Sequence, residues 1–208
     1  MGQRAACAPL RAVSRDALLL RCRDLALSRG EAVLFEGLDF SLHSGQLVQL
    51  RGVNGSGKTS LLRCMAGLLA PISGTCERFV STGFLAADSL WPGDLRVAEA
   101  AEIWAGLGSP RHEKPDFEPW GLAGLETAWL NQLSTGQRQR LRLLSLEAAR
   151  FPLWLLDEPL AGLDRAAQAQ VAARLERHRA GGGSAILVTH QPLDLAFDLQ
   201  RVLAIDSV

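Results

Sequence analysis

One octapeptide decides the fold, Gly52-Val53-Asn54-Gly55-Ser56-Gly57-Lys58-Thr59. It fits the pattern GxxxxGK[ST]. Glycines at these positions let backbone N–H groups turn inward and face an anion. A helix that begins at about Lys58 points its positive dipole end at the same place. The octapeptide therefore predicts a loop that cradles phosphate groups.

The side chains of this loop add specific contacts. Lys58 is expected to reach the β- and γ-phosphates of a nucleotide, and the hydroxyl of Thr59 can ligate Mg²⁺. Lysine suits the role because it is a compact charge on a flexible stem. The chain otherwise favours arginine, and its only other lysine is Lys114. The expected phosphate contacts come from Gly52, Val53, Asn54, Gly55, Ser56, Gly57, Lys58, Thr59 and Ser60.

Apolar strands and amphipathic helices alternate along the chain. The loop follows a strand at 47–50 and precedes a helix at 61–69, with Leu61, Met65 and Leu68 on one face and Pro71 and Gly74 ending it. Strands alternating with helices predict an α/β fold with a mainly parallel sheet. The other expected strands are 18–27 and 33–42 around a turn at 28–30, then 76–80, 82–85, 153–156, 185–188 and 202–205; the other expected helices are 135–150, 165–180 and 193–199.

Acidic side chains follow the continuously apolar strand 153–156, which is typical of a parallel sheet buried on both faces. Ligands of open α/β sheets bind at the carboxyl ends of the strands. Asp157 is therefore expected beside the phosphates as a ligand of Mg²⁺. Glu158 is expected to orient or deprotonate the attacking water. His190 ends the next strand, where it can contact the γ-phosphate or that water.

The sequence predicts a short extension at residues 1–15 and a single domain at residues 16–208. Residues 89 to about 131 differ from their surroundings, because prolines interrupt them and most of the tryptophans lie there. Together with the helix that follows, they predict an inserted helical subdomain at about 89–150. No internal repeat is visible.

The composition excludes several classes of protein. The formal net charge is zero, which argues against a nucleic-acid binder with a broad basic surface. No apolar run approaches the ~18–20 residues that a membrane-spanning helix needs. The four cysteines show neither a CxxC pair nor zinc-ligand spacing. We therefore expect reduced thiols in a cytoplasmic protein.

From about Leu18 to its end, the chain resembles the nucleotide-binding domains of ABC transporters. The decisive segment, Leu133-Ser134-Thr135-Gly136-Gln137, is similar to the LSGGQ signature of that family. Ser134 can also cap the helix that follows, with Gln137 completing a capping box. Residues 160–164 are similar to the D-loop of the family, and Asp164 can cap the next helix.

The resemblance implies a P-loop ATPase with an N-terminal antiparallel β subdomain and an inserted helical subdomain. It implies that the chain binds ATP and Mg²⁺ and works as a homodimer. Ser134, Gly136 and Gln137 of one copy, with Asp164 nearby, would complete the site for ATP held by the other copy. The dimer would sit peripherally on transmembrane permease subunits, at the cytoplasmic face of the bacterial inner membrane.

Within the family, the chain is most similar to the ATP-binding subunits of cytochrome c biogenesis systems, which act in haem export or haem-chaperone release. Residues 34–38, 51–63, 66–69 and 189–193 carry this similarity, and the short chain length fits it. The implied partners are the permease subunits of a cytochrome c maturation complex. The chain has no CxxCH motif, so any haem would be handled by those partners.

Three positions depart from the family pattern. Thr135 replaces the first glycine of the signature pair, and Gly136 is kept. Arg29 stands where an aromatic residue usually stacks on adenine, and an arginine plane can also stack on a base. Ala86-Ala87-Asp88 follows Phe84-Leu85, where the family has a glutamine. Asp88 is expected to hold Mg²⁺ or water, with an altered charge at the contact to the membrane partner.

Three other functions remain open on these residues. The chain could be a transporter ATPase for another cargo, since no residue is expected to contact cargo. A non-transport ABC ATPase usually has two ATPase domains or a coiled-coil insertion, and neither is present. A P-loop kinase of small molecules would explain Lys58 but not the signature segment.

Overall fold

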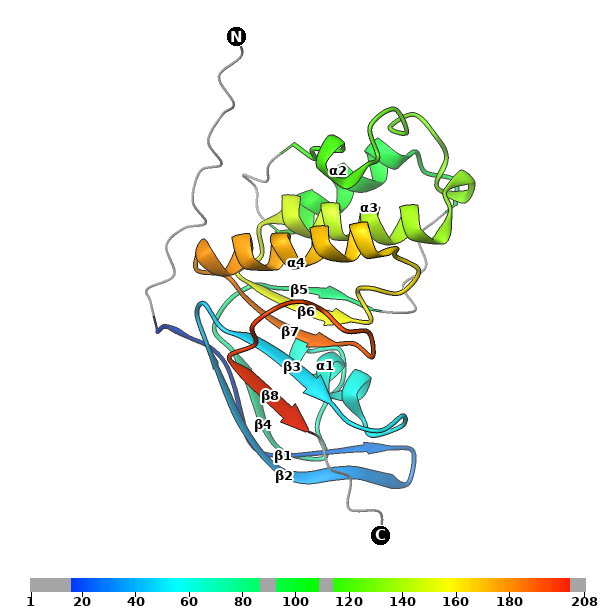
Figure 1. Ribbon diagram of the computed structural model, residues 1–208. Coiled ribbons are helices and arrows are strands. Elements are labelled where there is room, and N and C mark those ends of the chain that lie inside the picture. The colour runs from blue at the N-terminus through cyan, green and yellow to red at the C-terminus, as the bar shows by residue number, and fades with distance from the viewer. Residues whose placement is uncertain (1–15, 87–92, 109–113, 203–208) are drawn as a thin grey trace.

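The computed structural model describes residues 16–86, 93–108 and 114–202. Two sheets and the helices around them are stacked in layers (Figure 1). Helix α1 lies between the antiparallel and the parallel sheet, α3 and α4 cover the other face of the parallel sheet, and α2 packs against α3. The expected extension at 1–15 and the expected ligand Asp88 lie outside the described residues.

The antiparallel sheet has the strand order β2-β1-β4. Its strands are β1 (Leu18–Arg29), β2 (Ala32–His43) and β4 (Ser73–Arg78). The turn between β1 and β2 lies at Gly30 and Glu31, slightly later than expected, because the ladder of β1 continues to Arg29. Gly30 has a φ of 62°, which glycine adopts without strain.

The larger sheet is parallel throughout, with the strand order β5-β6-β7-β3-β8. Its strands are β3 (Leu47–Arg51), β5 (Thr82–Leu85), β6 (Leu153–Asp157), β7 (Ser184–Val188) and β8 (Leu199–Val202). All five residues of β6 and of β7 are buried, as expected for strands covered on both faces. The predicted mixed fold is confirmed.

Each face of the parallel sheet has its own hydrophobic core. Alternate residues of the strands point to opposite faces, so Leu155 and Ile186 pack with α1 and the antiparallel sheet. Leu156 and Leu187 pack with α3 and α4. The helices are α1 (Lys58–Ala66), α2 (Val97–Gly108), α3 (Thr135–Ala149) and α4 (Arg165–Ala180), with the short 3₁₀ helices η1 (Glu118–Trp120) and η2 (Leu130–Gln132). None of the helices among the described residues has the length and apolar character needed to cross a membrane.

Two expected helices differ in the structure. Helix α1 begins at Lys58, as the phosphate loop predicts, but ends at Ala66, three residues before the expected end at 69, because Gly67 takes the left-handed conformation and caps it. Leu68 therefore lies beyond the helix and is 69% exposed, whereas Leu61 and Met65 are buried, so the expected common helix face of the three is wrong. Pro71 and Gly74 follow the helix end and do not cause it. Residues 193–198 form no helix, and β8 begins at Leu199. Residues 203–205 of the strand expected at 202–205 lie outside the described residues.

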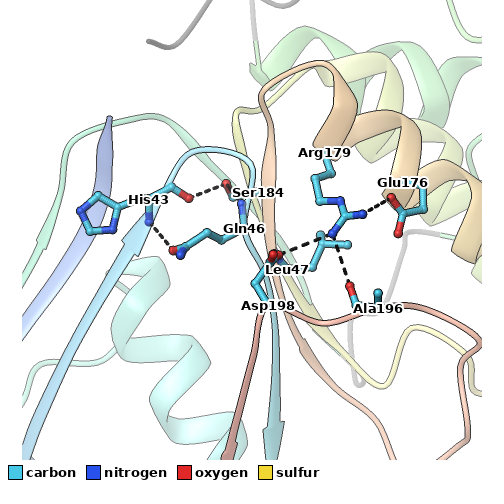
Figure 2. Close-up of polar contacts among 8 residues, drawn as sticks. All are labelled: His43, Gln46, Leu47, Glu176, Arg179, Ser184, Ala196 and Asp198. Carbon is cyan, nitrogen blue, oxygen red and sulfur yellow. Dashed lines mark hydrogen bonds and ion pairs between the residues drawn. The ribbon is translucent and has the colours of Figure 1, made fainter. Parts of the chain in front are cut away.

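Polar contacts explain why residues 193–198 are not helical (Figure 2). The backbone N–H of Leu47, at the start of β3, donates to the Asp198 carboxylate at 2.8 Å. Arg179 of α4 forms ion pairs with Asp198 at 3.6 Å and with Glu176 at 2.7 Å. These contacts hold the segment beside β3, where its chain continues as β8. The hydroxyl of Ser184 donates to the carbonyl of His43, joining the same end of the sheet to β2.

A buried histidine lies at the end of α4. His178 stacks on Trp154 with ring centroids 3.9 Å apart, and its Nε2 lies 3.2 Å from the carbonyl oxygen of Ser184. Burial lowers the pKa of His178 to about 4, against smaller opposing effects of the backbone at Ser184 and Pro152. The folded protein therefore holds this imidazole neutral under conditions in which an exposed histidine becomes charged.

We expect acid to destabilise the fold through this residue. Below a pH of about 6.5 the unfolded chain binds a proton at His178 that the folded chain does not bind until about pH 4. Stability is therefore lost as the pH falls through this window, by up to about 3 kcal/mol. Urea unfolding at pH 7.5 and pH 5 measures the loss. His178→Gln, which does not titrate, should lose less stability between these pH values; an equal loss contradicts the assignment.

Candidate functional site

A cavity of about 290 Å³ opens at the carboxyl ends of β3, β6 and β7. Eleven of the residues predicted from sequence line it. They are Arg29, Asn54, Gly55, Ser56, Gly57, Lys58, Thr59, Ser60, Asp157, Glu158 and His190. Gly52, Val53 and the signature residues do not line it. The topology of the parallel sheet thus brings together side chains that lie far apart in the chain.

Glycines shape the loop before α1. Gly55 and Gly57 have φ angles of 86° and 84°, in the left-handed region. A Cβ on Gly57 would lie 3.1 Å from Cδ1 of Leu34, so a side chain there would also be crowded. Gly57 caps α1 without a side-chain hydrogen bond to the first turn of the helix. The N–H groups of that turn are oriented toward an anion, as at other helix N-termini.

Two side chains of the loop are buried and polar. The ammonium of Lys58 donates to the carbonyls of Gly52 at 2.9 Å and Val53 at 2.8 Å. An ammonium has three donors, so one remains for a ligand. The hydroxyl of Ser56 is buried and has no hydrogen-bond partner among the described residues. A buried hydroxyl without a partner is costly, and a phosphate oxygen in the loop would satisfy it.

A hydrogen bond joins the phosphate loop to the aspartate at the end of β6. The hydroxyl of Thr59 donates to Oδ2 of Asp157 at 2.8 Å. Asp157 is 3% exposed at the end of β6. A hydroxyl and a carboxylate oxygen are the hard ligands that Mg²⁺ prefers. The described residues contain no cluster of three or more His, Cys, Asp or Glu able to hold a metal. A cation here would therefore need further oxygens from a phosphate or from water.

The residue after Asp157 has an unusual backbone. Glu158 has a φ of 50°, which is uncommon for a residue with a side chain. Its N–H donates to the carbonyl of Val188 at 2.8 Å, which ties it to the end of β7. Gln139 of α3 donates to the carbonyl of Pro159 at 2.9 Å and supports the same turn. The turn brings Oε1 of Glu158 within 3.6 Å of Nε2 of His190.

The signature segment caps α3 as its sequence predicts. The hydroxyl of Ser134 accepts from the N–H of Gln137 at 3.2 Å, and the Gln137 side chain accepts from the N–H of Ser134 at 2.8 Å. Gly136 lies against the next loop, because a Cβ on it would be 2.8 Å from the carbonyl oxygen of Gly162. Asp164 caps α4 by accepting from the N–H of Ala167 at 2.8 Å. The predicted capping roles of Ser134 and Asp164 are confirmed.

Sequence reasoning missed two residues of the cavity wall, Leu34 and Val188. Leu34 belongs to β2, and its side chain packs beneath Gly57. No local pattern distinguishes it from other apolar residues of that strand. Val188 is the last residue of β7, and its position before Thr189 and His190 could have revealed it.

The fold and this site define a phosphate-loop ATP-binding protein. Residues 35–161 match the family model described as ABC transporter. A curated relative from Novosphingobium aromaticivorans, Cytochrome c biogenesis ATP-binding export protein CcmA, is 40% identical over 182 residues, covering 88% of this chain and 93% of the relative. The relative of the same name from Paracoccus denitrificans is 41% identical and covers 85% of each chain.

Solved structures agree with this assignment. An ABC transporter in an inward-facing conformation has a TM-score of 0.76 and 26% identity, covering 91% of this chain and 81% of its own. The ATP-binding subunit of another ABC transporter has a TM-score of 0.75 at 23% identity, which shows the shared fold. The chain belongs to the ABC transporter family and, within it, to the cytochrome c biogenesis ATP-binding export proteins. It is thus an ATP-binding ATPase of the ABC type.

Lys58→Ala should weaken ATP binding at least tenfold, because the charge reaching the phosphates is lost. Isothermal titration calorimetry with ATP measures the effect. The chain offers a matched control, since its other lysine, Lys114, is exposed and does not line the cavity. Lys114→Ala should bind ATP as the unmodified protein does. Unchanged affinity in Lys58→Ala would remove this residue from the site.

Proposed function

We propose that this chain is the Mg²⁺-dependent ATP-hydrolysing subunit of a transport complex for cytochrome c biogenesis. It acts as a homodimer on the cytoplasmic face of the bacterial inner membrane and powers transmembrane permease subunits. One observation carries the proposal: Asp157, Glu158 and His190 converge on the phosphate loop. The assignment of the two relatives to cytochrome c biogenesis supports the choice of pathway.

The residues around the loop fit a nucleotide triphosphate. The open N–H groups of α1, the remaining donor of Lys58 and the buried hydroxyl of Ser56 bind phosphate oxygens. Thr59 and Asp157 hold Mg²⁺, which neutralises charge on the phosphates when it is bound. Arg29 lies at the end of β1 in the cavity wall, where its guanidinium plane can cover the base.

Glu158 and His190 act on the water that attacks the γ-phosphate. Glu158 orients this water or accepts its proton. Its side chain is 26% exposed, and that of His190 is 57% exposed, so the open cavity gives water access to both. Such access in a single chain suits a site that is closed by a second molecule.

A second copy supplies that closure. Ser134 and Gly136 do not line the cavity of their own chain. They lie at the N-terminus of α3, which favours an anion as the N-terminus of α1 does. In a head-to-tail dimer, Ser134, Gly136 and Gln137 of each copy complete the phosphate site of the other. Asp164 caps α4, at the end of the loop that packs against Gly136, and it borders the same interface.

A groove lined largely by apolar side chains, outside the nucleotide cavity, supports the proposal of a membrane partner. It has a volume of about 510 Å³ and lies between α1, β5, α2 and α3. Apolar side chains such as Phe84 and Trp104 line much of it, and Leu107 is 66% exposed. Exposed apolar surface of this kind marks an interaction site. We assign the groove to a cytoplasmic segment of the permease subunits.

Glu158→Gln should reduce ATP hydrolysis at least a hundredfold while ATP binding persists, because the water loses its base and the phosphate contacts remain. The trapped ATP should favour the dimer, which gel filtration with Mg-ATP detects as a larger species. Glu102→Gln, on an exposed position of α2 outside the cavity, is the control and should hydrolyse ATP normally. A mutant that stays monomeric, where the active protein dimerises, counts against the proposed closure.

Purification from native membranes tests the partners. The unmodified chain should bring down the permease subunits of a cytochrome c maturation complex; recovery with an unrelated permease would overturn the proposed pathway. Leu107→Glu places a charge in the groove and should abolish co-purification. Ile72→Glu is its control, since Ile72 is 55% exposed and lies outside the groove. Equal recovery of both variants would reject the groove as the contact.

A further inference from the structure

Three thiols converge beneath the antiparallel sheet, away from the nucleotide cavity. Cys22 lies on β1, Cys64 on α1 and Cys76 on β4. The Cys22 thiol donates to Sγ of Cys76 across 3.4 Å, and Cys64 is also hydrogen-bonded to Cys76. None of the three forms a disulfide in the structure. Cys22 and Cys64 are buried, and Cys76 is partly exposed.

The strand register suits a disulfide between two of them. Cys22 and Cys76 are direct partners in the antiparallel pairing of β1 and β4. Directly opposed residues have Cα atoms about 4.5–5.5 Å apart. A disulfide spans Cα separations of about 4.4–6.8 Å. The bond can therefore form by rotating side chains, without moving either strand.

The surroundings of Cys76 favour its thiolate. Hydrogen bonds from the Cys22 and Cys64 thiols lower the pKa of Cys76, and the nearby positive charge of Arg78 acts in the same direction. The hydrogen bond with Cys76, and then burial, raise the pKa of Cys64. The three thiols are thus unequal, because one is a partly exposed nucleophile and the others are buried proton donors.

We propose that Cys76 is a site of reversible oxidation that ends in a disulfide with Cys22. The Cys76 thiolate attacks a low-molecular-weight disulfide such as oxidised glutathione, forming a mixed disulfide and releasing one thiolate. The Cys22 sulfur then attacks Sγ of Cys76, and its proton passes to the low-molecular-weight thiolate that leaves as the second thiol. The two protein thiols are oxidised, and one small disulfide is reduced to two thiols.

The disulfide would close a ring around the phosphate loop. Residues 22 to 76 include β2, β3, the loop at 52–59 and α1. None of the three cysteines lines the nucleotide cavity. The bond should therefore restrict the unfolded chain without altering the ATP contacts. We expect oxidation to raise the melting temperature by at least about 5 °C and to leave ATP affinity within twofold.

The sequence offers a direct test by mass spectrometry. Trypsin cuts after Arg21, Arg23, Arg63 and Arg78, which releases Cys22 in residues 22–23 and both other cysteines in residues 64–78. The folded protein, carrying Cys7→Ala to remove the remaining thiol, is incubated with oxidised glutathione and digested without reduction. The proposal expects residues 22–23 joined to residues 64–78. A bond within residues 64–78, or a mixed disulfide that never resolves, would overturn it.

Single variants identify the partner within that peptide. Cys64→Ala should still form the cross-link, whereas Cys76→Ala should not. Loss of the cross-link in Cys64→Ala would overturn the assigned pairing. A further check does not depend on variants. At pH 6 the folded chain should react with oxidised glutathione faster than the same chain unfolded in urea, because only an activated thiol is ionised at this pH. Oxidation that occurs only in urea would show that the native site does not exist.

Discussion

The hydrogen bond from Thr59 to Asp157 joins the start of α1 to the end of β6. Both residues are fixed in place by the hydrophobic core behind them. Helix α1 is anchored by Leu61, Leu62 and Met65 in the core between the two sheets, and β6 is buried along its whole length. The other groups of the site depend on this junction. Lys58 directly precedes Thr59 in the sequence, and Glu158 directly follows Asp157.

The signature helix α3, which we propose completes the site of a second copy, is attached to the core through different contacts. The indole of Trp120 donates to Glu147 at 2.9 Å, and Arg174 of α4 pairs with the same carboxylate at 2.8 Å. Arg174 also lies over the ring of Trp120, 5.6 Å from its centroid. These side chains join η1, α3 and α4. The helix that begins with the signature is therefore fixed to the layer that covers the parallel sheet, at the end far from Ser134.

Local chemistry made parts of this structure predictable. Ser134 and Asp164 cap their helices with their own side chains, so α3 and α4 begin where the sequence indicates. Asp157 and His190 could be placed because strands of a parallel sheet end at one edge. Tertiary contacts decided the rest. Asp198 is held by Leu47, which is remote in sequence, and this contact replaces the helix that the local pattern favours. The packing of Leu34 beneath the phosphate loop is likewise a tertiary contact, which the sequence of β2 alone does not indicate.

The geometry of the signature also explains why one chain is an incomplete unit under the proposed function. Gly136 is packed against Gly162, and Gly162 lies in the loop that leads from Glu158 to Asp164. The start of α3 is therefore held beside this loop, and it does not line the cavity that Glu158 borders. An anion bound at that helix start must come from another molecule. Under the proposed function, the start of α3 that binds the partner's phosphate is thus packed against the loop that begins at Glu158, so the two sites of the dimer share a tightly packed contact.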